Sequence, residues 1–334
     1  MNKKHIALLS GALLAGAAGT AMAQAQSAYT DADLVWKEDF NGKKLSGKDW
    51  NFEYHEQGWV NAELQRYGDA KQNTYVKEGC LVIQALKKTN KDGTVEYTSG
   101  RINTQGKHEF TYGRFEARLK VPAGKGFLPA FWMMPGDESY YGQWPKCGEI
   151  DIMEVMGQGT AKLYGTIHFG DPHAQAQGTR VLSDGNFHDD FHVFAVEWEP
   201  GEIRWYCDGV LFHKANDWFT KKAGFNEVSY PAPFDQPFYI ILNLAVGGSW
   251  VGYPDDSVNF DPASDDAKLF VDYVKVYQKK SYNEDVEKTA PAPVVAVTDA
   301  SGNMVSDKTD AWEFMTAGGG IGSAQSDGKS HVIT

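Results

Sequence analysis

Short strand-like runs separated by Gly- and Asp-containing turns recur from residue 34 to residue 278, and they constrain the fold more than any other feature. Residues 238–246 form an apolar run, as expected for a strand buried on both faces. Within residues 34–278, no stretch of comparable length has the helical period. Further strands are predicted at residues 81–86, 192–198, 203–207 and 270–277, with turns at Lys91-Asp92-Gly93 and Asp208-Gly209. The pattern predicts an all-β sandwich or barrel.

The N-terminus has the pattern of a secretory signal peptide. Basic residues 1–5 precede an apolar, small-residue run that ends at Ala21-Met22-Ala23, an A-x-A cleavage site. The run is too short and too rich in Gly, Ala and Thr for a stable transmembrane span. We therefore exclude residues 1–23 from the fold. We expect an exported protein, periplasmic or extracellular, with no membrane anchor.

The composition changes near the C-terminus. The change begins at about Glu284, and Thr289-Ala290-Pro291-Ala292-Pro293 is typical of a stiff linker. We expect a main domain at residues 28–280, a linker at 281–297, and an incomplete β module or disordered tail at 298–334. The last segment is too short to form a stable β module without additional crosslinks.

Charge and aromatic content restrict the class of partner. The formal net charge of −12 argues against nucleic acids and other polyanions, because the field of the protein repels them, whereas neutral polymers are unaffected. The chain contains 10 Trp and 16 Tyr, more rings than a core of this size requires. Exposed rings hold the apolar faces of sugars. The expected partner is a neutral polysaccharide, and the chain shows no signature of a subunit interface, so we expect a monomer.

Three carboxylates within six residues form the candidate site: Glu149, Asp151 and Glu154. In a regular strand the first two share a face and Glu154 points to the other. A β-bulge around Ile152 or Met153 would return Glu154 to the face of the other acids. Two carboxyls about 5–5.5 Å apart are the arrangement of a retaining glycosidase. The alternative is a solvent-facing strand with hydrated acids.

The three cysteines, Cys80, Cys147 and Cys207, are an odd number at wide spacing, which is neither a disulfide framework nor a zinc motif. One disulfide is compatible with the sequence, but the spacing does not select a pair. Cys147 lies close to the acids, so a cysteine nucleophile with His168 as its base is an alternative, although no nucleophile signature surrounds it.

The segment from Glu149 to Glu154 resembles the E-x-D-x-x-E signature of family 16 glycoside hydrolases, in the bulged form of the laminarinase branch, the endo-1,3-β-glucanases. The resemblance runs from Leu34 to Gln278. Its other blocks are WVNAELQ at 59–65, SGRI at 99–102, YGRFE at 112–116, PAFW at 129–132, GTIH at 165–168, NLAVGG at 243–248 and VDYVKVY at 271–277. The resemblance implies a β-jelly-roll sandwich, concanavalin A-like, of two curved antiparallel sheets with an open substrate groove.

The resemblance also implies a role for each acid. Glu149 is the nucleophile and must be ionised to attack the anomeric carbon; Glu154 is the general acid/base and must be protonated to help the glycosidic oxygen depart. Asp151 is the assisting acid. Water then follows the same route, and the anomeric configuration is retained. No cofactor is required for this chemistry.

Further residues match family positions that contact sugar. Trp132 and Trp144 match rings that stack on glucose, Asn61 and Arg101 match groups that bind sugar hydroxyls, and His168 matches a histidine near Glu154. Weaker candidates are Trp59, Glu63 and Trp250. The alternative for each is a structural role, such as core packing for the tryptophans or a buried, hydrogen-bonded histidine.

Some family members carry a structural calcium ion on the convex face. The matching positions are Asp39, Gly79 and Asp272, and hard oxygen ligands suit calcium. Asp39 stands where relatives often have Glu, which shortens the reach of this ligand.

These features predict a secreted endo-hydrolase of β-1,3-glucans such as laminarin. A mixed-linkage β-1,3-1,4-glucanase is the alternative within the enzymes, because the same acids serve both. A non-catalytic β-glucan-binding protein is the alternative outside them. Relatives of that kind usually lack one or both glutamates, whereas Glu149 and Glu154 are both present here.

Overall fold

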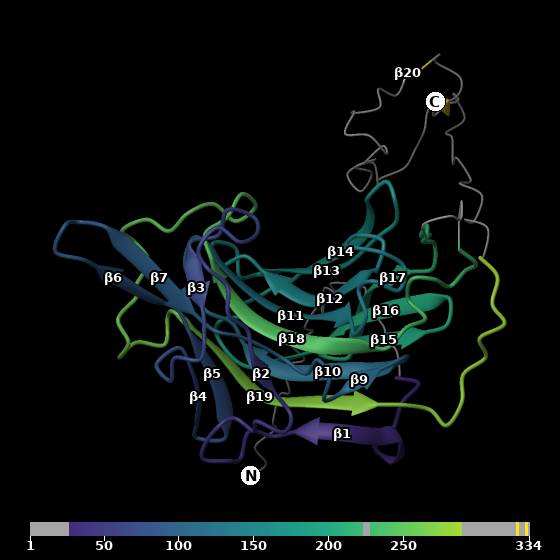
Figure 1. Ribbon diagram of the computed structural model, residues 1–334, viewed down its shortest axis with the longest axis horizontal. Coiled ribbons are helices and arrows are strands. Elements are labelled where there is room, and N and C mark those ends of the chain that lie inside the picture. Colours follow the sequence, from purple (N-terminus) through teal and green to yellow (C-terminus); the bar gives the residue numbers. More distant parts are fainter. Residues whose placement is uncertain (1–26, 223–227, 289–324, 327–330, 333–334) are drawn as a thin grey trace, which may run out of the picture.

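The computed structural model describes residues 27–222, 228–288, 325–326 and 331–332. Two large antiparallel sheets lie one against the other (Figure 1). The back sheet contains, in spatial order, β17 (Val210–Ala215), β16 (Glu202–Cys207), β15 (His192–Glu199), β10 (Gly113–Lys120), β19 (Lys268–Tyr277), β5 (Cys80–Gln84) and β4 (Thr74–Lys77), with β1 (Leu34–Glu38) paired to β19.

The front sheet carries the three acids. It contains, in spatial order, β14 (Ala174–Val181), β13 (Lys162–Phe169), β12 (Glu149–Val155), β11 (Phe127–Pro135), β18 (Phe238–Val246), β8 (Arg101–Asn103) and β2 (Asn51–Phe52), with β9 (Glu109–Phe110) on β18. The remaining elements are a small sheet of β3 (Gln65–Tyr67), β7 (Val95–Ser99) and β6 (Leu86–Thr89), the pair β20 (Gln325–Ser326) and β21 (His331–Val332), and the 3-10 helix η1 (Asp31–Asp33). The two stacked sheets confirm the predicted jelly-roll sandwich.

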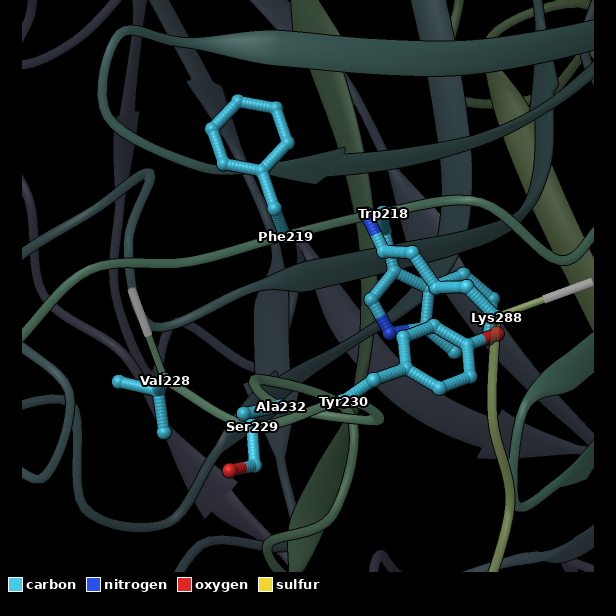
Figure 2. Close-up of a pocket in the computed structure, with 7 residues that line it drawn as sticks. All are labelled: Trp218, Phe219, Val228, Ser229, Tyr230, Ala232 and Lys288. Carbon is cyan, nitrogen blue, oxygen red and sulfur yellow. The ribbon is translucent and has the colours of Figure 1, made fainter. Parts of the chain in front are cut away.

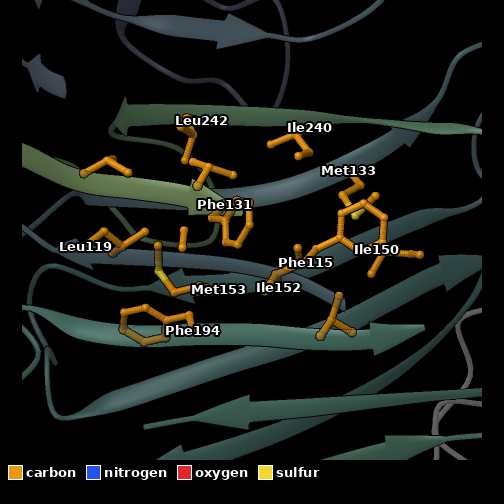
Figure 3. Packing of buried hydrophobic residues seen from close by; sticks show 14 of the residues in the cluster. Phe115, Leu119, Phe131, Met133, Ile150, Ile152, Met153, Phe194, Ile240 and Leu242 are labelled. Carbon is orange, nitrogen blue, oxygen red and sulfur yellow. The ribbon is translucent and has the colours of Figure 1, made fainter. Parts of the chain in front are cut away.

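The core lies between the two sheets. Alternate residues of each strand point into it, for example Phe115 of β10 opposite Phe131 and Met133 of β11 (Figure 3). The other face of the front sheet is therefore free to carry polar groups. We call it the site face. Strand β18 is buried along its whole length, as its apolar sequence predicted.

The predicted strands at 192–198, 203–207, 238–246 and 270–277 are confirmed as β15, β16, β18 and β19. The strand predicted at 81–86 is divided between β5 and β6. The backbone N–H of Ala85 donates to the carbonyl of Ala267, and the chain then leaves the back sheet for the small sheet. At the predicted turn, Asp208 and Gly209 both have positive φ, 50° and 73°, the conformation of a two-residue hairpin turn.

The signal peptide and the C-terminal segment lie almost entirely outside the described residues. The described part of the expected linker contacts the main domain: the ring of Tyr282 lies 5.2 Å from that of Tyr112, and Lys288 Nζ lies 3.1 Å from Asp217 Oδ1. Cys80, Cys147 and Cys207 are all free thiols, so the structure forms none of the disulfides that the sequence left open. No helix among the described residues is long and apolar enough to cross a membrane.

Candidate active site

Strand β12 contains the β-bulge that the acid spacing predicted. Its pairing with β13 passes from Asp151↔Thr166 directly to Glu154↔Tyr164, so two residues of β12 face one residue of β13. The side chains of Ile152 and Met153 are both fully buried in the core. Because these two successive side chains both point into the core, Glu154 points to the site face, where the other acids lie.

The strand beside the bulge is adapted to it. Gly165 of β13 lies opposite the bulge, and a Cβ at this position would come within 2.5 Å of Cδ1 of Trp205. The indole Nε1 of Trp205, from the back sheet, donates to the backbone carbonyl of Asp151 at 2.8 Å. A ring from the opposite sheet therefore fixes the backbone between the two glutamates, and only glycine leaves room for it.

The three acids occupy different environments. Asp151 is buried, with 3% of its surface exposed, whereas Glu149 and Glu154 keep partial exposure, as groups that must reach a substrate do. Burial, together with the charges of Glu149 and Glu63, raises the pKa of Glu154 to about 8. Burial and the charges of both glutamates raise the pKa of Asp151 well above its usual range.

Glu149 is the acid best able to ionise. Burial raises its pKa too, but Asp151 and Trp144 both donate hydrogen bonds that favour its charged form, the indole Nε1 of Trp144 at 2.8 Å from Oε2. Asp151 and Glu154 therefore hold their protons to higher pH than Glu149, which ionises first. This is the order of ionisation that a nucleophile and a general acid require.

The histidine expected near Glu154 lies at the other end of the strand. Antiparallel pairing sets His168 opposite Glu149, whereas Tyr164 lies opposite Glu154. His168 Nε2 lies 3.4 Å from Asp151 Oδ2. The expectation was wrong in position, because the connection between β12 and β13 fixes the register and the signature alone does not specify it.

Arg101, predicted to bind sugar hydroxyls, is held in a polar and aromatic cluster at the β8 side of the site. Its Nε donates to Glu53 Oε2 at 2.6 Å, and its guanidinium lies 4.6 Å from the ring centre of Trp132 and 5.2 Å from that of Trp59. The indole of Trp132 donates to Asn243 Oδ1 at 2.7 Å. The cluster presents aromatic surface and a fixed cation on the site face.

Two further candidates, Asn61 and Trp250, lie at exposed positions. Asn61 occupies a left-handed turn, with φ of 52°, and its carbonyl accepts a hydrogen bond from Ser249. Trp250 is exposed, and its ring meets that of Tyr164 edge to face at 5.2 Å. Since Tyr164 pairs with Glu154, Trp250 belongs to the acid/base side of the site.

Sequence reasoning missed three residues of this site: Glu53, Asn243 and His173. Glu53 accepts hydrogen bonds from Arg101 and Asn103, and His173 contacts His168 at 2.9 Å. Asn243 carried a usable signal, because it is the polar residue within the apolar run 238–246. Glu53 and His173 have no local pattern; they join the site through contacts between distant segments.

The structure argues against a cysteine nucleophile. Cys147 is buried beside Met134, Tyr239 and Ile241, and burial raises the pKa of its thiol to about 12, so the thiolate is absent at neutral pH. The base that this alternative requires is engaged elsewhere, because His168 Nε2 faces Asp151.

A cavity of about 350 Å³ is lined by residues on the β17–β18 connection and by Lys288 (Figure 2). None of the three acids lines it. Figure 2 shows Trp218 and Tyr230 next to each other there. The centres of their rings lie 5.1 Å apart. The chemistry of the acids is therefore not carried out in this cavity.

Glu149, Asp151 and His168 are the group that offers three potential metal ligands close together in the described part of the chain, with one ligand atom from each within 4.8 Å of the others. We assign these side chains to acid chemistry, since their hydrogen bonds and pKa shifts already account for their placement.

The expected calcium ligands come from segments that meet at one point of the back sheet. Strand β19 pairs with β1 through Val274↔Glu38 and with β5 through Val271↔Leu81. The end of β1 and the turn before β5 therefore meet beside Asp272.

Both carboxylates of this expected site already have cationic partners. Lys37 Nζ lies 2.6 Å from Asp39 Oδ2, and Arg118 lies 2.7 Å from Asp272 Oδ2. The third expected ligand, Gly79, lies in the turn between β4 and β5. A calcium ion at this position would have to displace both cations from the carboxylates. Calcium binding stays a prediction.

Thermal unfolding in calcium and in EDTA tests this prediction. If calcium binds, excess calcium stabilises the folded state by about 2–3 kcal/mol at 100 times the Kd, or roughly 4–10 °C in Tm. We expect Asp272→Asn to remove the difference between the two media. Equal melting temperatures for the unmodified protein in both would contradict calcium binding.

Comparison with known proteins agrees with this geometry. Residues 60–291 match the family described as "Glycosyl hydrolases family 16". Glucan endo-1,3-beta-glucosidase A1 of Niallia circulans is 40% identical over 76% of this chain, and this chain covers 39% of that protein. The beta-glucanase of Rhodothermus marinus is 40% identical over 74% of this chain and 85% of that protein. The structure of the endo-beta-1,3-glucanase from Pyrococcus furiosus is 40% identical in sequence and has a TM-score of 0.61. The match covers 73% of this chain and 93% of that one. This chain therefore belongs to family 16 of the glycosyl hydrolases.

Proposed function

We propose that this protein is a retaining endo-β-glucanase that hydrolyses internal β-1,3-glucosidic bonds in laminarin-type glucans. The observation that carries the proposal is the bulged strand β12, which places an ionisable nucleophile and an acid with a pKa of about 8 on one face. Sequence identities of 40% to proteins named as glucan endo-1,3-beta-glucosidase and beta-glucanase support the substrate class.

The arrangement performs a double displacement. The carboxylate of Glu149 attacks the anomeric carbon while Glu154 gives its proton to the departing glycosidic oxygen, which leaves a glucosyl-enzyme ester. Glu154, now ionised, takes a proton from water, and the water attacks the same carbon and releases Glu149. A sugar hydroxyl in place of water gives transglycosylation. Asp151 keeps its proton toward Glu149 and limits the negative charge around the nucleophile.

Product analysis tests this function. The protein comprising residues 24–334 is incubated with laminarin, mixed-linkage barley glucan and carboxymethyl cellulose, and the oligosaccharides are separated. We expect a ladder of products from laminarin, with the β-anomer appearing first in the proton NMR spectrum. Faster release from barley glucan would favour a mixed-linkage enzyme. Binding without products would indicate a glucan-binding protein.

We also propose that the mature protein is exported and acts as a monomer. The basic and apolar segment before Ala23 supports export, and the acidic net charge of −12 suits a protein that meets neutral glucan. Cell fractionation and N-terminal sequencing of the mature chain test the first part, and light scattering of the purified protein tests the second.

Glu53 positions the sugar-binding cluster at the β8 side. It accepts hydrogen bonds from Arg101, His55 and Asn103 at 2.6, 2.8 and 2.7 Å. We expect Glu53→Gln to raise KM for laminarin about 10-fold with little change in kcat, since the reacting acids are untouched. It also leaves the buried Arg101 without its counter-charge, which costs roughly 3 kcal/mol in the free energy of unfolding.

Steady-state kinetics and urea unfolding measure these two effects. The matched control is Glu56→Gln, the same chemical change at an exposed position of the same loop. A fall in kcat with KM unchanged would contradict the assignment of Glu53 to substrate binding.

A further inference from the structure

His173 contacts the catalytic centre through one histidine. It lies in the turn between β13 and β14, and its Nε2 is 2.9 Å from Nδ1 of His168. The two rings are nearly parallel, with centres 5.2 Å apart and an interplanar angle of 21°. His168 in turn directs Nε2 toward Asp151, at 3.4 Å from Oδ2. The chain of contacts runs from an exposed loop to the buried acid.

The protons in this series of side-chain contacts can be assigned. Asp151 Oδ2 is buried and has no hydrogen-bond partner among the described residues, so the group that faces it, His168 Nε2, must carry a proton to satisfy it. Burial and the neighbouring His173 lower the pKa of His168 to about 4, so its ring is neutral at working pH and holds a single N–H. Its Nδ1 is then an acceptor, and the donor at 2.9 Å is His173 Nε2.

The loop that carries His173 is held against the nucleophile from a second direction. The ring of Trp144 lies 4.9 Å from that of His173, and its Nε1 donates to Glu149. Lys146 Nζ forms an ion pair with Asp171 Oδ2 at 3.2 Å, which joins the two loops. His173 is thus placed independently of His168, as a residue that orients another must be.

We propose that His173 is a positioning residue of the glycosidase reaction: it donates from Nε2 to Nδ1 of His168, fixes His168 in the Nε2–H tautomer, and so provides Asp151 with the donor it lacks. Apo hydrogen bonds around reacting groups are often long and shorten when substrate binds, which fits the 3.4 Å contact. The inference rests on the proposed function for its kinetic consequence, but the tautomer itself does not depend on the substrate.

The histidine tautomers are measured directly by long-range ¹H–¹⁵N NMR on the full-length protein, with the His168 signals assigned from His168→Gln. We expect the Nε2–H form alone in the unmodified protein and a mixture of tautomers in His173→Ala. His173→Gln should restore the single form, because its amide nitrogen can donate to Nδ1. An Nδ1–H tautomer in the unmodified protein would overturn the proposal.

Kinetics on laminarin provide the second readout. We expect His173→Ala to lower kcat about 10-fold with KM within twofold, and His173→Gln to recover most of the loss. Asp184→Asn, at an exposed position in the turn that follows β14, is the control, expected to leave kcat unchanged. A rise in KM alone would show that His173 only forms a wall of the sugar site. Absence of laminarin hydrolysis by the unmodified protein would refute the function, while the NMR result would still decide the tautomer.

Discussion

Glu149→Gln is expected to lower kcat on laminarin by at least about 10⁴-fold, because the amide cannot form the glucosyl ester and the remaining groups cannot replace a nucleophile. The substitution also removes a charge from a group of three neighbouring acids, so the Tm should stay the same or rise. Loss of activity with a retained Tm would therefore reflect chemistry and not unfolding. The measurement is reducing-sugar release over several hours, with Glu96→Gln, an exposed acid of β7, as the control.

Azide distinguishes the nucleophile from the acid/base. In Glu149→Ala the space left by the carboxylate admits azide, which attacks an activated β-glucoside once and gives the α-glycosyl azide. In Glu154→Ala, azide attacks the intermediate and gives the β-glycosyl azide. The opposite pair of products would exchange the two roles, and activity of Glu149→Gln above one hundredth of the unmodified level would exclude it as the nucleophile.

Glu154→Gln is expected to lower kcat by about 10²–10⁴-fold and to remove the alkaline limb of the pH profile. In the unmodified protein kcat/KM should fall as pH rises through about 8, the pKa of Glu154, because the general acid then loses its proton. A substrate with a dinitrophenolate leaving group needs no proton at departure, so the variant should cleave its first bond at a near-normal rate. An alkaline limb that survives in Glu154→Gln would contradict the assignment.

The same pKa affects stability. A carboxyl whose pKa is raised in the folded state holds its proton while the unfolded chain has released it, so the free energy of unfolding falls as pH rises from about 4.5 to about 8. Glu154→Gln lacks this titration. The melting temperature of the variant relative to the unmodified protein should therefore be higher at pH 8 than at pH 5. Differential scanning calorimetry of both proteins at the two pH values measures this difference.

Local pattern was sufficient for much of the fold. Side chains of a strand alternate with period two, so the apolar run of β18 and the alternation of β19 identify strands without any knowledge of their neighbours. The bulge could also be predicted, because Glu149, Asp151 and Glu154 cannot share one face of a regular strand. The number of such strands and the turns between them indicated a sandwich or a barrel, and the resemblance to family 16 selected the sandwich.

The site could be predicted only in part, because its remaining contacts join segments far apart in the chain. Glu53 reaches Arg101 across 48 residues, and Trp132 reaches Asn243 across 111. Which strands are neighbours depends on the pairing of whole sheets, and no residue of β8 indicates that it will lie beside β18.

The sequence by itself determined the strands, the bulge and the identity of the three acids, since each depends on spacing within a few residues. The tertiary structure decided how those acids titrate, because the pKa of Glu154 depends on the burial and charges that folding brings around it. It also decided the register that sets His168 against Asp151 and allows His173 to reach His168. These interactions act over a few ångströms in space, and distance along the chain does not reveal them.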